Sequence, residues 1–214
     1  MQAQPLFDIN CRLCPRLSAF LDGVKDQYPE YHARPVPPFG DADAQLLIVG
    51  LAPGMHGANA SGRPFTGDFA GILLYETLFK YGFSNQPESE SKDDGLKLIN
   101  CRITNAVKCL PPQNKPVGDE IKTCNRFLQQ ELNALPSGAG VVALGSIAHN
   151  AVLKALQLKL KDYPFQHAKV HHSPSGLWFI DSYHCSRYNT QTKRLTPEMF
   201  HNVFAIARRQ LGTG

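Results

Sequence analysis

The chain has 214 residues, of which 43% are hydrophobic and 19% charged, and its net charge is +4. This length fits one α/β domain with a sizeable core and is short for two, so we expect a single domain over residues 1–214. No apolar run approaches the roughly 18–20 residues that span a bilayer, and the N-terminus lacks the basic start and apolar centre of a signal peptide. We therefore expect no membrane partner and a cytoplasmic or nucleoid-associated location.

A strand-like apolar run and a helical pattern alternate along the chain. Apolar runs predict strands at about residues 45–50, 102–107, 141–145 and 177–183. Helical periodicity predicts helices at about residues 15–21, 71–82, 117–135, 146–158 and 197–211. Ser146 and Thr196 stand where helix N-caps belong, and Pro197 suits a first helical position. The alternation predicts an α/β fold: a three-layer α/β/α sandwich around a central four-stranded parallel sheet.

The loop that follows the first predicted strand is rich in glycine. Residues 50–71 read GLAPGMHGANASGRPFTGDFAG. In an open α/β sheet such a loop lies at the carboxyl end of a strand, where ligands bind, and glycine lets the backbone approach a ligand closely. The loop matches neither the P-loop nor the dinucleotide-binding glycine pattern. Because the other predicted strands also end in unusual polar residues, we expect one site at this rim of the sheet.

Six cysteines in a chain without an export signal argue against a disulfide framework. Cys11 and Cys14 form one close pair, whereas Cys109 and Cys124 are separated by fourteen residues. Four thiolates could bind a tetrahedral zinc ion or a [4Fe–4S] cluster, and the spacing does not decide between them. Reduced thiols buried in the core are a third reading.

Three separated motifs resemble those of family-5 uracil-DNA glycosylases, the broad-specificity iron–sulfur members of the uracil-DNA glycosylase superfamily. They are the glycine-rich stretch 50–68, the segment 105–115 (NAVKCLPPQNK) followed by Cys124, and the stretch 184–196 (HCSRYNTQTKRLT). Two departures occur: Ala60-Ser61 replaces an expected Arg-Thr, and Cys185 stands where the family usually has proline. The resemblance runs from Cys11 to about Thr196, and implies a [4Fe–4S] cluster held by Cys11, Cys14, Cys109 and Cys124.

The resemblance also implies site residues. Those with catalytic roles are Asp68, His184 and Asn105. Those that would contact the base are Phe65, Leu51, Ala52, His56 and Asn59, and those that would contact DNA are Ser186, Arg187, Asn189 and Arg194. Each main candidate also has an ordinary structural reading, because Asp68 could cap the following helix and Phe65 could be a core residue. Asn105 could cap a turn, and His184 could be satisfied by the backbone.

The implied function is a monofunctional DNA glycosylase. Such an enzyme extrudes a base from the duplex, hydrolyses its N-glycosidic bond with water as the nucleophile and leaves an abasic site. Uracil and other deaminated bases are the expected targets, DNA is the expected partner and a monomer is the expected state. The alternatives are a glycosylase for hypoxanthine or another modified base, a non-catalytic iron–sulfur DNA-binding module, and a zinc-stabilised hydrolase acting on a small nucleoside.

Overall fold

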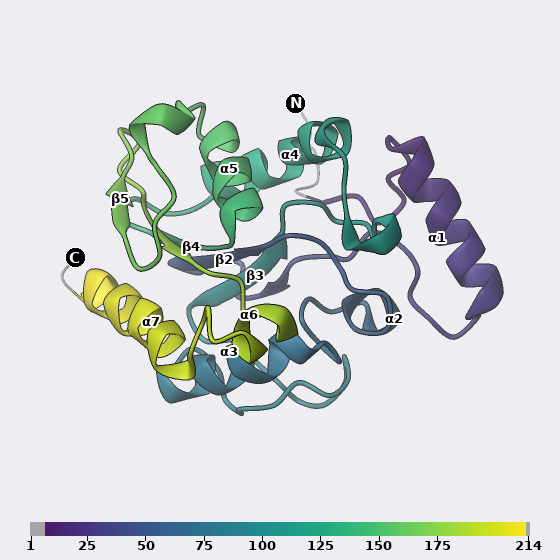
Figure 1. The fold of residues 1–214 in the computed structure, drawn as a ribbon, viewed down its shortest axis with the longest axis horizontal. Coiled ribbons are helices and arrows are strands. Elements are labelled where there is room, and N and C mark those ends of the chain that lie inside the picture. Colours follow the sequence, from purple (N-terminus) through teal and green to yellow (C-terminus); the bar gives the residue numbers. More distant parts are fainter. Residues whose placement is uncertain (1–6, 213–214) are drawn as a thin grey trace.

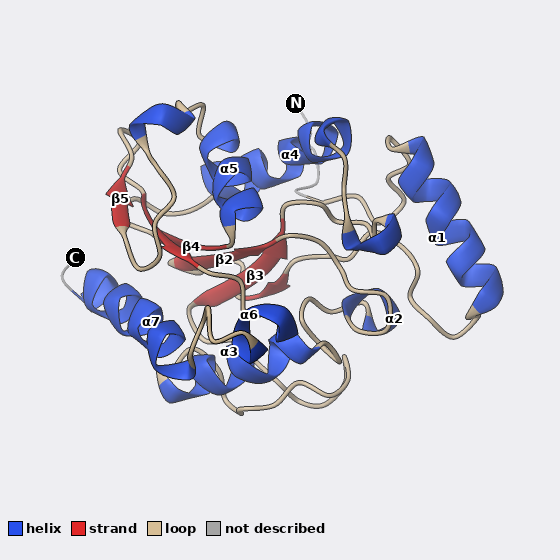
Figure 2. Cartoon of the chain, in the orientation of Figure 1, coloured by secondary structure: helices blue, strands red, loops and turns tan. Residues whose placement is uncertain are grey.

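The computed structural model describes residues 7–212, so the predicted domain extends beyond the described residues at both ends. Six strands form one sheet in the order β1-β3-β2-β4-β6-β5 (Figures 1 and 2). The strands are β1 (Phe39–Gly40), β2 (Leu46–Gly50), β3 (Cys101–Asn105), β4 (Gly140–Leu144), β5 (Val170–His172) and β6 (Trp178–Ser182). The four central strands are parallel to one another, and the two edge strands are antiparallel to their neighbours.

The α/β class and the four parallel strands are confirmed, but the sheet is larger than the predicted four strands. The additional strands are β1, which lies before β2, and β5, which lies before β6, and neither segment was predicted to be a strand. β1 has two residues and β5 has three. Such short segments cannot display the alternation of apolar and polar residues by which a strand is read from sequence. Their pairing with β3 and β6 is a tertiary outcome.

Helices cover both faces of the sheet, which gives the three layers that were expected (Figure 1). α3 and α7 lie on one face, and α4 and α5 on the other. The longer helices are α1 (Pro15–Gln27), α3 (Phe69–Lys80), α4 (Gly118–Asn133), α5 (Ser146–Ala155) and α7 (Pro197–Gly212). The short ones are α2 (Ala58–Ser61), α6 (Arg187–Gln191) and the 3₁₀ turns Pro112–Asn114 and Leu160–Asp162. Within residues 7–212, no helix has both the length and the apolarity needed to cross a membrane.

The two predicted N-caps have different outcomes. The Oγ1 atom of Thr196 accepts a hydrogen bond from the Met199 N–H at 3.2 Å, as expected at the start of α7. The prediction for Ser146 was wrong, because Gly145 occupies the cap position of α5 and Ser146 is the first helical residue. Gly145 has φ +93°, which glycine adopts without a Cβ clash and which turns the chain directly from β4 into α5.

Candidate active site

The loops after β2, β3 and β6 surround a cleft of about 410 Å³ at the carboxyl ends of these strands. Parallel strands bring these ends to one edge of the sheet, which is why three distant motifs meet there. Eight of the predicted site residues line the cleft, and these are Leu51, Ala52, Phe65, Asp68, Asn105, His184, Ser186 and Arg187. Gly54, Ala58, Phe69, Ala70 and Asn114 complete the lining.

Asp68 stands at the N-cap position of α3, yet its side chain makes no capping hydrogen bond. Its Oδ2 atom accepts a hydrogen bond from the Ala58 N–H at 3.1 Å. The carboxylate occupies space that two glycines leave free, since a Cβ on Gly57 would lie 2.0 Å from the Asp68 Cγ and one on Gly54 would lie 2.5 Å from Oδ1. Burial raises the pKa of Asp68, while the Ala58 N–H and His56 act in the opposite direction. The side chain therefore faces the glycine-rich loop and the cleft instead of capping its own helix.

His184 follows β6 and lies against the ring of Phe65, with centroids 6.1 Å apart and planes inclined by 27°. Its Nδ1 atom is buried and has no hydrogen-bond partner. Burial lowers the pKa of His184 to about 4, so the imidazole is neutral at pH 7 and carries one donor and one acceptor. The Asn189 side chain donates a hydrogen bond to the His184 carbonyl oxygen at 2.8 Å. Asn189, which does not line the cleft, thus fixes the backbone that presents His184.

Asn105 is the last residue of β3, and its Oδ1 atom is buried without a partner. A Cβ on Gly50 would lie 2.4 Å from this oxygen and 2.7 Å from the Phe65 ring. Gly50 therefore makes room for both side chains. Phe65 itself has φ +59°, an uncommon conformation for an aromatic residue. A buried amide oxygen without a partner costs free energy, which a ligand N–H donor would recover.

Three further predicted site residues are not among those that line the cleft. His56 is exposed, and its Nδ1 lies 2.9 Å from the Tyr31 hydroxyl. Asn59 is fully buried and donates to the Met55 carbonyl oxygen at 3.4 Å. The Arg194 guanidinium lies over the Tyr183 ring, 4.9 Å from its centroid. In the structure these side chains contact other parts of the protein, outside the cleft.

Asn114 lines the cleft and was not predicted as a site residue. It follows Gln113 in the proline-rich loop, and both residues have positive φ, of +55° and +56°. Asparagine tolerates this left-handed conformation better than most residues, so an Asn in a loop stiffened by prolines was the available signal. Strained backbone of this kind is concentrated at functional sites.

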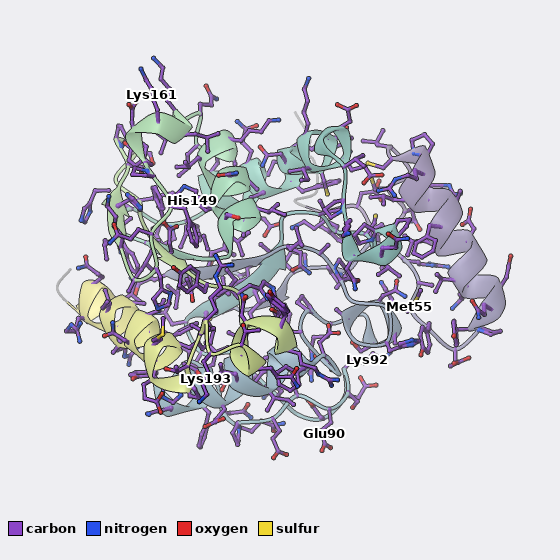
Figure 3. All side chains as sticks on the ribbon, viewed as in Figure 1. Met55, Glu90, Lys92, His149, Lys161 and Lys193 are labelled. Atoms are coloured by element: carbon purple, nitrogen blue, oxygen red, sulfur yellow. The ribbon has the colours of Figure 1, made fainter. Side chains whose placement is uncertain are left out.

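A second hollow of about 720 Å³ adjoins the cleft and shares Asp68, Phe69 and Arg187 with it. Residues 87–90 form its opposite wall. They belong to the loop between α3 and β3, which is rich in acidic residues and is marked by Glu90 in Figure 3. Arg63 ties this loop to the glycine-rich stretch, since its guanidinium donates to both carboxylate oxygens of Asp94, at 2.9 and 2.6 Å. The pair lowers the pKa of Asp94 well below its usual range. The wall of the hollow is thus anchored to the loop that carries Asp68.

Cys11, Cys14, Cys109 and Cys124 line one small cavity between α1 and α4. All four are free thiols, and within the described part of the chain no three of their Sγ atoms lie within 4.8 Å of one another. Burial raises the pKa of Cys14, Cys109 and Cys124, and the neighbouring cysteines act in the same direction. The other two cysteines, Cys101 and Cys185, are buried in the hydrophobic core. The fold therefore assembles the four predicted ligands from three distant segments.

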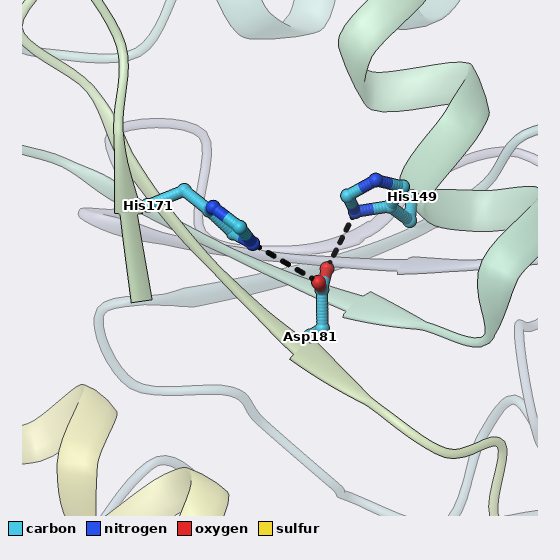
Figure 4. A group of neighbouring side chains, drawn as sticks. All are labelled: His149, His171 and Asp181. Carbon is cyan, nitrogen blue, oxygen red and sulfur yellow. Dashed lines mark hydrogen bonds and ion pairs between the residues drawn. The ribbon is translucent and has the colours of Figure 1, made fainter. Parts of the chain in front are cut away.

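A buried network supports β6 just before His184 (Figure 4). Asp181 Oδ1 lies 2.7 Å from His149 Nδ1, and Asp181 Oδ2 lies 3.2 Å from His171 Nε2. The remaining His149 nitrogen lies 2.9 Å from the Tyr163 carbonyl oxygen. The facing atoms of the three side chains lie within 4.8 Å of one another, but each is already hydrogen-bonded. The network ties α5 and β5 to β6 and needs no metal ion to account for it.

A family model for the Uracil DNA glycosylase superfamily matches residues 37–208. A protein of Thermus thermophilus named type-5 uracil-DNA glycosylase is 47% identical over 207 residues, which cover 94% of each chain. The type-5 protein of Pyrobaculum aerophilum is 43% identical, with 95% of this chain and 90% of that relative covered. A type-4 uracil-DNA glycosylase of the same organism is 31% identical, and the match covers 73% of this chain and 67% of that relative.

Proposed function

Since this chain belongs to the uracil DNA glycosylase superfamily and matches type-5 uracil-DNA glycosylases over most of its length, we propose that it excises uracil from DNA by hydrolysing the N-glycosidic bond. The product would be an abasic site in an intact strand. Removal of the base in this way is the first step of base excision repair. We propose further that the enzyme acts as a single domain over residues 1–214 and as a monomer.

The convergence of Asp68, Asn105 and His184 on one cleft is the observation that carries this proposal. A uracil ring presents an N–H flanked by two carbonyl groups. The unpartnered Oδ1 of Asn105 suits that N–H, and the neutral imidazole of His184 can donate to a carbonyl oxygen. Phe65 would stack on the base, with Leu51 and Ala52 closing the apolar wall. These partners read the edge and the face of an extruded base.

The same groups suit the charges that develop during hydrolysis. As the bond breaks, positive charge grows on the sugar and negative charge grows on the departing base. A hydrogen bond from His184 stabilises the base, and the Asp68 carboxylate either stabilises the sugar or orients the attacking water. No lysine is among the described residues that line the cleft, so no amine there could serve as the nucleophile. This supports water as the nucleophile and a monofunctional enzyme.

Arg187 is the cation best placed to meet a DNA phosphate beside the extruded nucleotide. It is exposed, it lines both the cleft and the second hollow, and its guanidinium lies over the Phe69 ring, 4.9 Å from the centroid. Ser186, Asn189 and Arg194 lie on the same segment and would contact the backbone nearby. Contacts of this kind give affinity and salt dependence without sequence preference.

We extend the proposal to other deaminated bases, including hypoxanthine. The hollow of about 720 Å³ adjoins the cleft and shares Asp68, Phe69 and Arg187 with it, which favours a site with room for more than one base size. Position 51 is leucine, and among the described residues that line the cleft only Asp68 carries a carboxylate.

We propose that the four cysteines hold a [4Fe–4S] cluster. Cys11, Cys14, Cys109 and Cys124 line one cavity, and four thiolates are the ligand set that both zinc and a [4Fe–4S] cluster accept. The resemblance of these segments to those of the iron–sulfur uracil-DNA glycosylases favours the cluster over a zinc ion. The cluster would be structural, because hydrolysis transfers no electron. It would join residues 11–14 to the loop after β3 and to α4.

The test is to incubate the purified protein with a labelled duplex that contains one uracil opposite guanine, and then to treat the DNA with hot alkali. A strand break that appears only after alkali is the expected result. A break before alkali would overturn the monofunctional mechanism. If neither sample shows a break but the protein still binds the duplex, uracil excision is overturned. A duplex that carries hypoxanthine would then distinguish a non-catalytic DNA-binding module, which leaves it intact, from a glycosylase with a different target base.

A further inference from the structure

Lys108 is the only lysine that is buried in the described part of the chain, with 1% of its surface exposed. Its Nζ atom lies 2.5 Å from Glu131 Oε1, and Glu131 is as deeply buried. The same Nζ contacts the Thr104 hydroxyl. Burying two charges is costly, and an apolar pair of similar size often stabilises a protein as well. The pair therefore invites an explanation other than stability.

The main chain of Lys108 is held by the same helix as its side chain. Its N–H donates to the Cys124 Sγ at 3.3 Å, and its carbonyl oxygen accepts from the Val36 N–H at 2.7 Å. Cys124 and Glu131 are seven residues apart on α4, which places them on one face of the helix. Lys108 is thus attached to α4 at two points, two helical turns apart.

This attachment closes the turn that begins at Asn105. The Lys108 side chain reaches back over residues 105–107 to Thr104, the residue before Asn105 on β3. Between them, the N–H groups of Ala106 and Val107 donate to the carbonyl oxygens of Gly50 and Leu51, at 2.9 Å each. The turn therefore lies between the cleft, where Asn105 has an unpartnered oxygen, and the cysteine cavity, where Cys109 follows Lys108.

We propose that Lys108 is a positioning residue: its buried ion pair with Glu131 holds the turn 105–108 so that Asn105 faces the extruded base. The inference rests on the proposed function for the identity of the group that Asn105 contacts. A hydrogen-bonding side chain must be held within about 0.5 Å to act on a substrate, and a misplacement of about 1 Å can cost roughly 100-fold in rate. A charged pair with a third partner gives that precision because its geometry is directional.

The main variant is the double substitution Lys108→Met with Glu131→Leu. It removes both charges at similar volume, so we expect the thermal midpoint to stay near that of the wild type. Lys122→Met is the matched control, since Lys122 is an exposed lysine on α4, the helix that carries Glu131. Thr104→Val removes only one partner of Lys108 and gives the same comparison if the double variant does not fold.

The first readout is independent of activity. Hydrogen exchange at the amides of Ala106 and Val107 should be at least about tenfold faster in the double variant than in Lys122→Met, because the turn opens more often. Unchanged exchange in a folded double variant would overturn the proposal, whether or not the protein acts on uracil. An inactive wild-type protein would overturn the proposed function alone, and the exchange result would still decide the role of Lys108.

The second readout is the single-turnover rate on a uracil-containing duplex at saturating enzyme. We expect a roughly 10- to 100-fold fall in this rate for the double variant, with a smaller change in the enzyme concentration that gives half the maximal rate, because a misplaced Asn105 affects the transition state more than DNA binding. Lys122→Met should match the wild type in both quantities. A wild-type rate in the folded double variant would overturn the proposal even if exchange became faster.

Discussion

Substituting Gly50 by alanine would test whether the cleft depends on a close approach between β2, Asn105 and Phe65. The new Cβ would lie 2.4 Å from the Asn105 Oδ1 and 2.7 Å from the Phe65 ring, whereas ordinary contacts begin at 3.4 Å. Both side chains must therefore withdraw, Asn105 by about 1 Å. Gly50 is not among the glycines with positive φ, so the perturbation is steric and not a matter of backbone strain.

The expected loss follows from that displacement. A misplacement of about 1 Å in a group that contacts the substrate can lower the rate roughly 100-fold, which corresponds to about 2.7 kcal/mol of transition-state stabilisation. Crowding of a packed site should also lower the free energy of unfolding by about 1–3 kcal/mol. The two effects are separable, because activity can be measured well below the thermal midpoint.

The assay is single-turnover excision from a uracil-containing duplex at saturating enzyme. Gly118→Ala is the matched control, since a Cβ at Gly118 would meet no atom within 4 Å. We expect Gly118→Ala to act like the wild type and Gly50→Ala to be about 100-fold slower. Equal rates for the two folded variants would refute the argument that Gly50 sets the positions of Asn105 and Phe65.

Four further predictions concern charges and ligands. Asp68→Asn and His184→Ala should each lower the single-turnover rate by about 10²–10³, and a wild-type rate in either variant would remove that residue from the mechanism. Because the pKa of His184 falls from its usual value near 6.5 to about 4 in the folded protein, the unfolded chain binds a proton first on acidification. Stability should therefore decline as the pH falls from about 6.5 towards 4, and thermal midpoints of His184→Ala across this range should show a weaker decline. Cys109→Ser should lose iron, visible colour and thermal stability, whereas retention of all three would contradict the ligand assignment. Arg187→Ala should weaken DNA binding and reduce the slope of log affinity against log salt by about 1, as titrations at several salt concentrations would reveal.

Local patterns were enough to predict the parallel strands and the longer helices. Apolar runs and helical periodicity are repeated signals, and the alternation of the two leaves few topologies open. The same patterns placed the glycine-rich stretch at a strand end, and the parallel sheet then required the loops after β2, β3 and β6 to meet. The meeting of these three loops at one cleft therefore follows from patterns that the sequence alone displays.

The competing readings of individual side chains could not be resolved in that way. Asp68 occupies an N-cap position by sequence, and only the space left by Gly54 and Gly57 directs its carboxylate away from the helix terminus. His56 belongs to the same loop, yet Tyr31 on a distant segment holds it outside the cleft. Other features also depend on partners from elsewhere in the chain: the edge strands β1 and β5, the cap at Gly145 and the Lys108–Glu131 pair. Sequence determines which loops reach the rim, because repeated local patterns place the parallel strands and their carboxyl ends. Which side chains of those loops enter the cleft is decided by tertiary packing, because the atoms that exclude or pair with each side chain come from elsewhere in the chain.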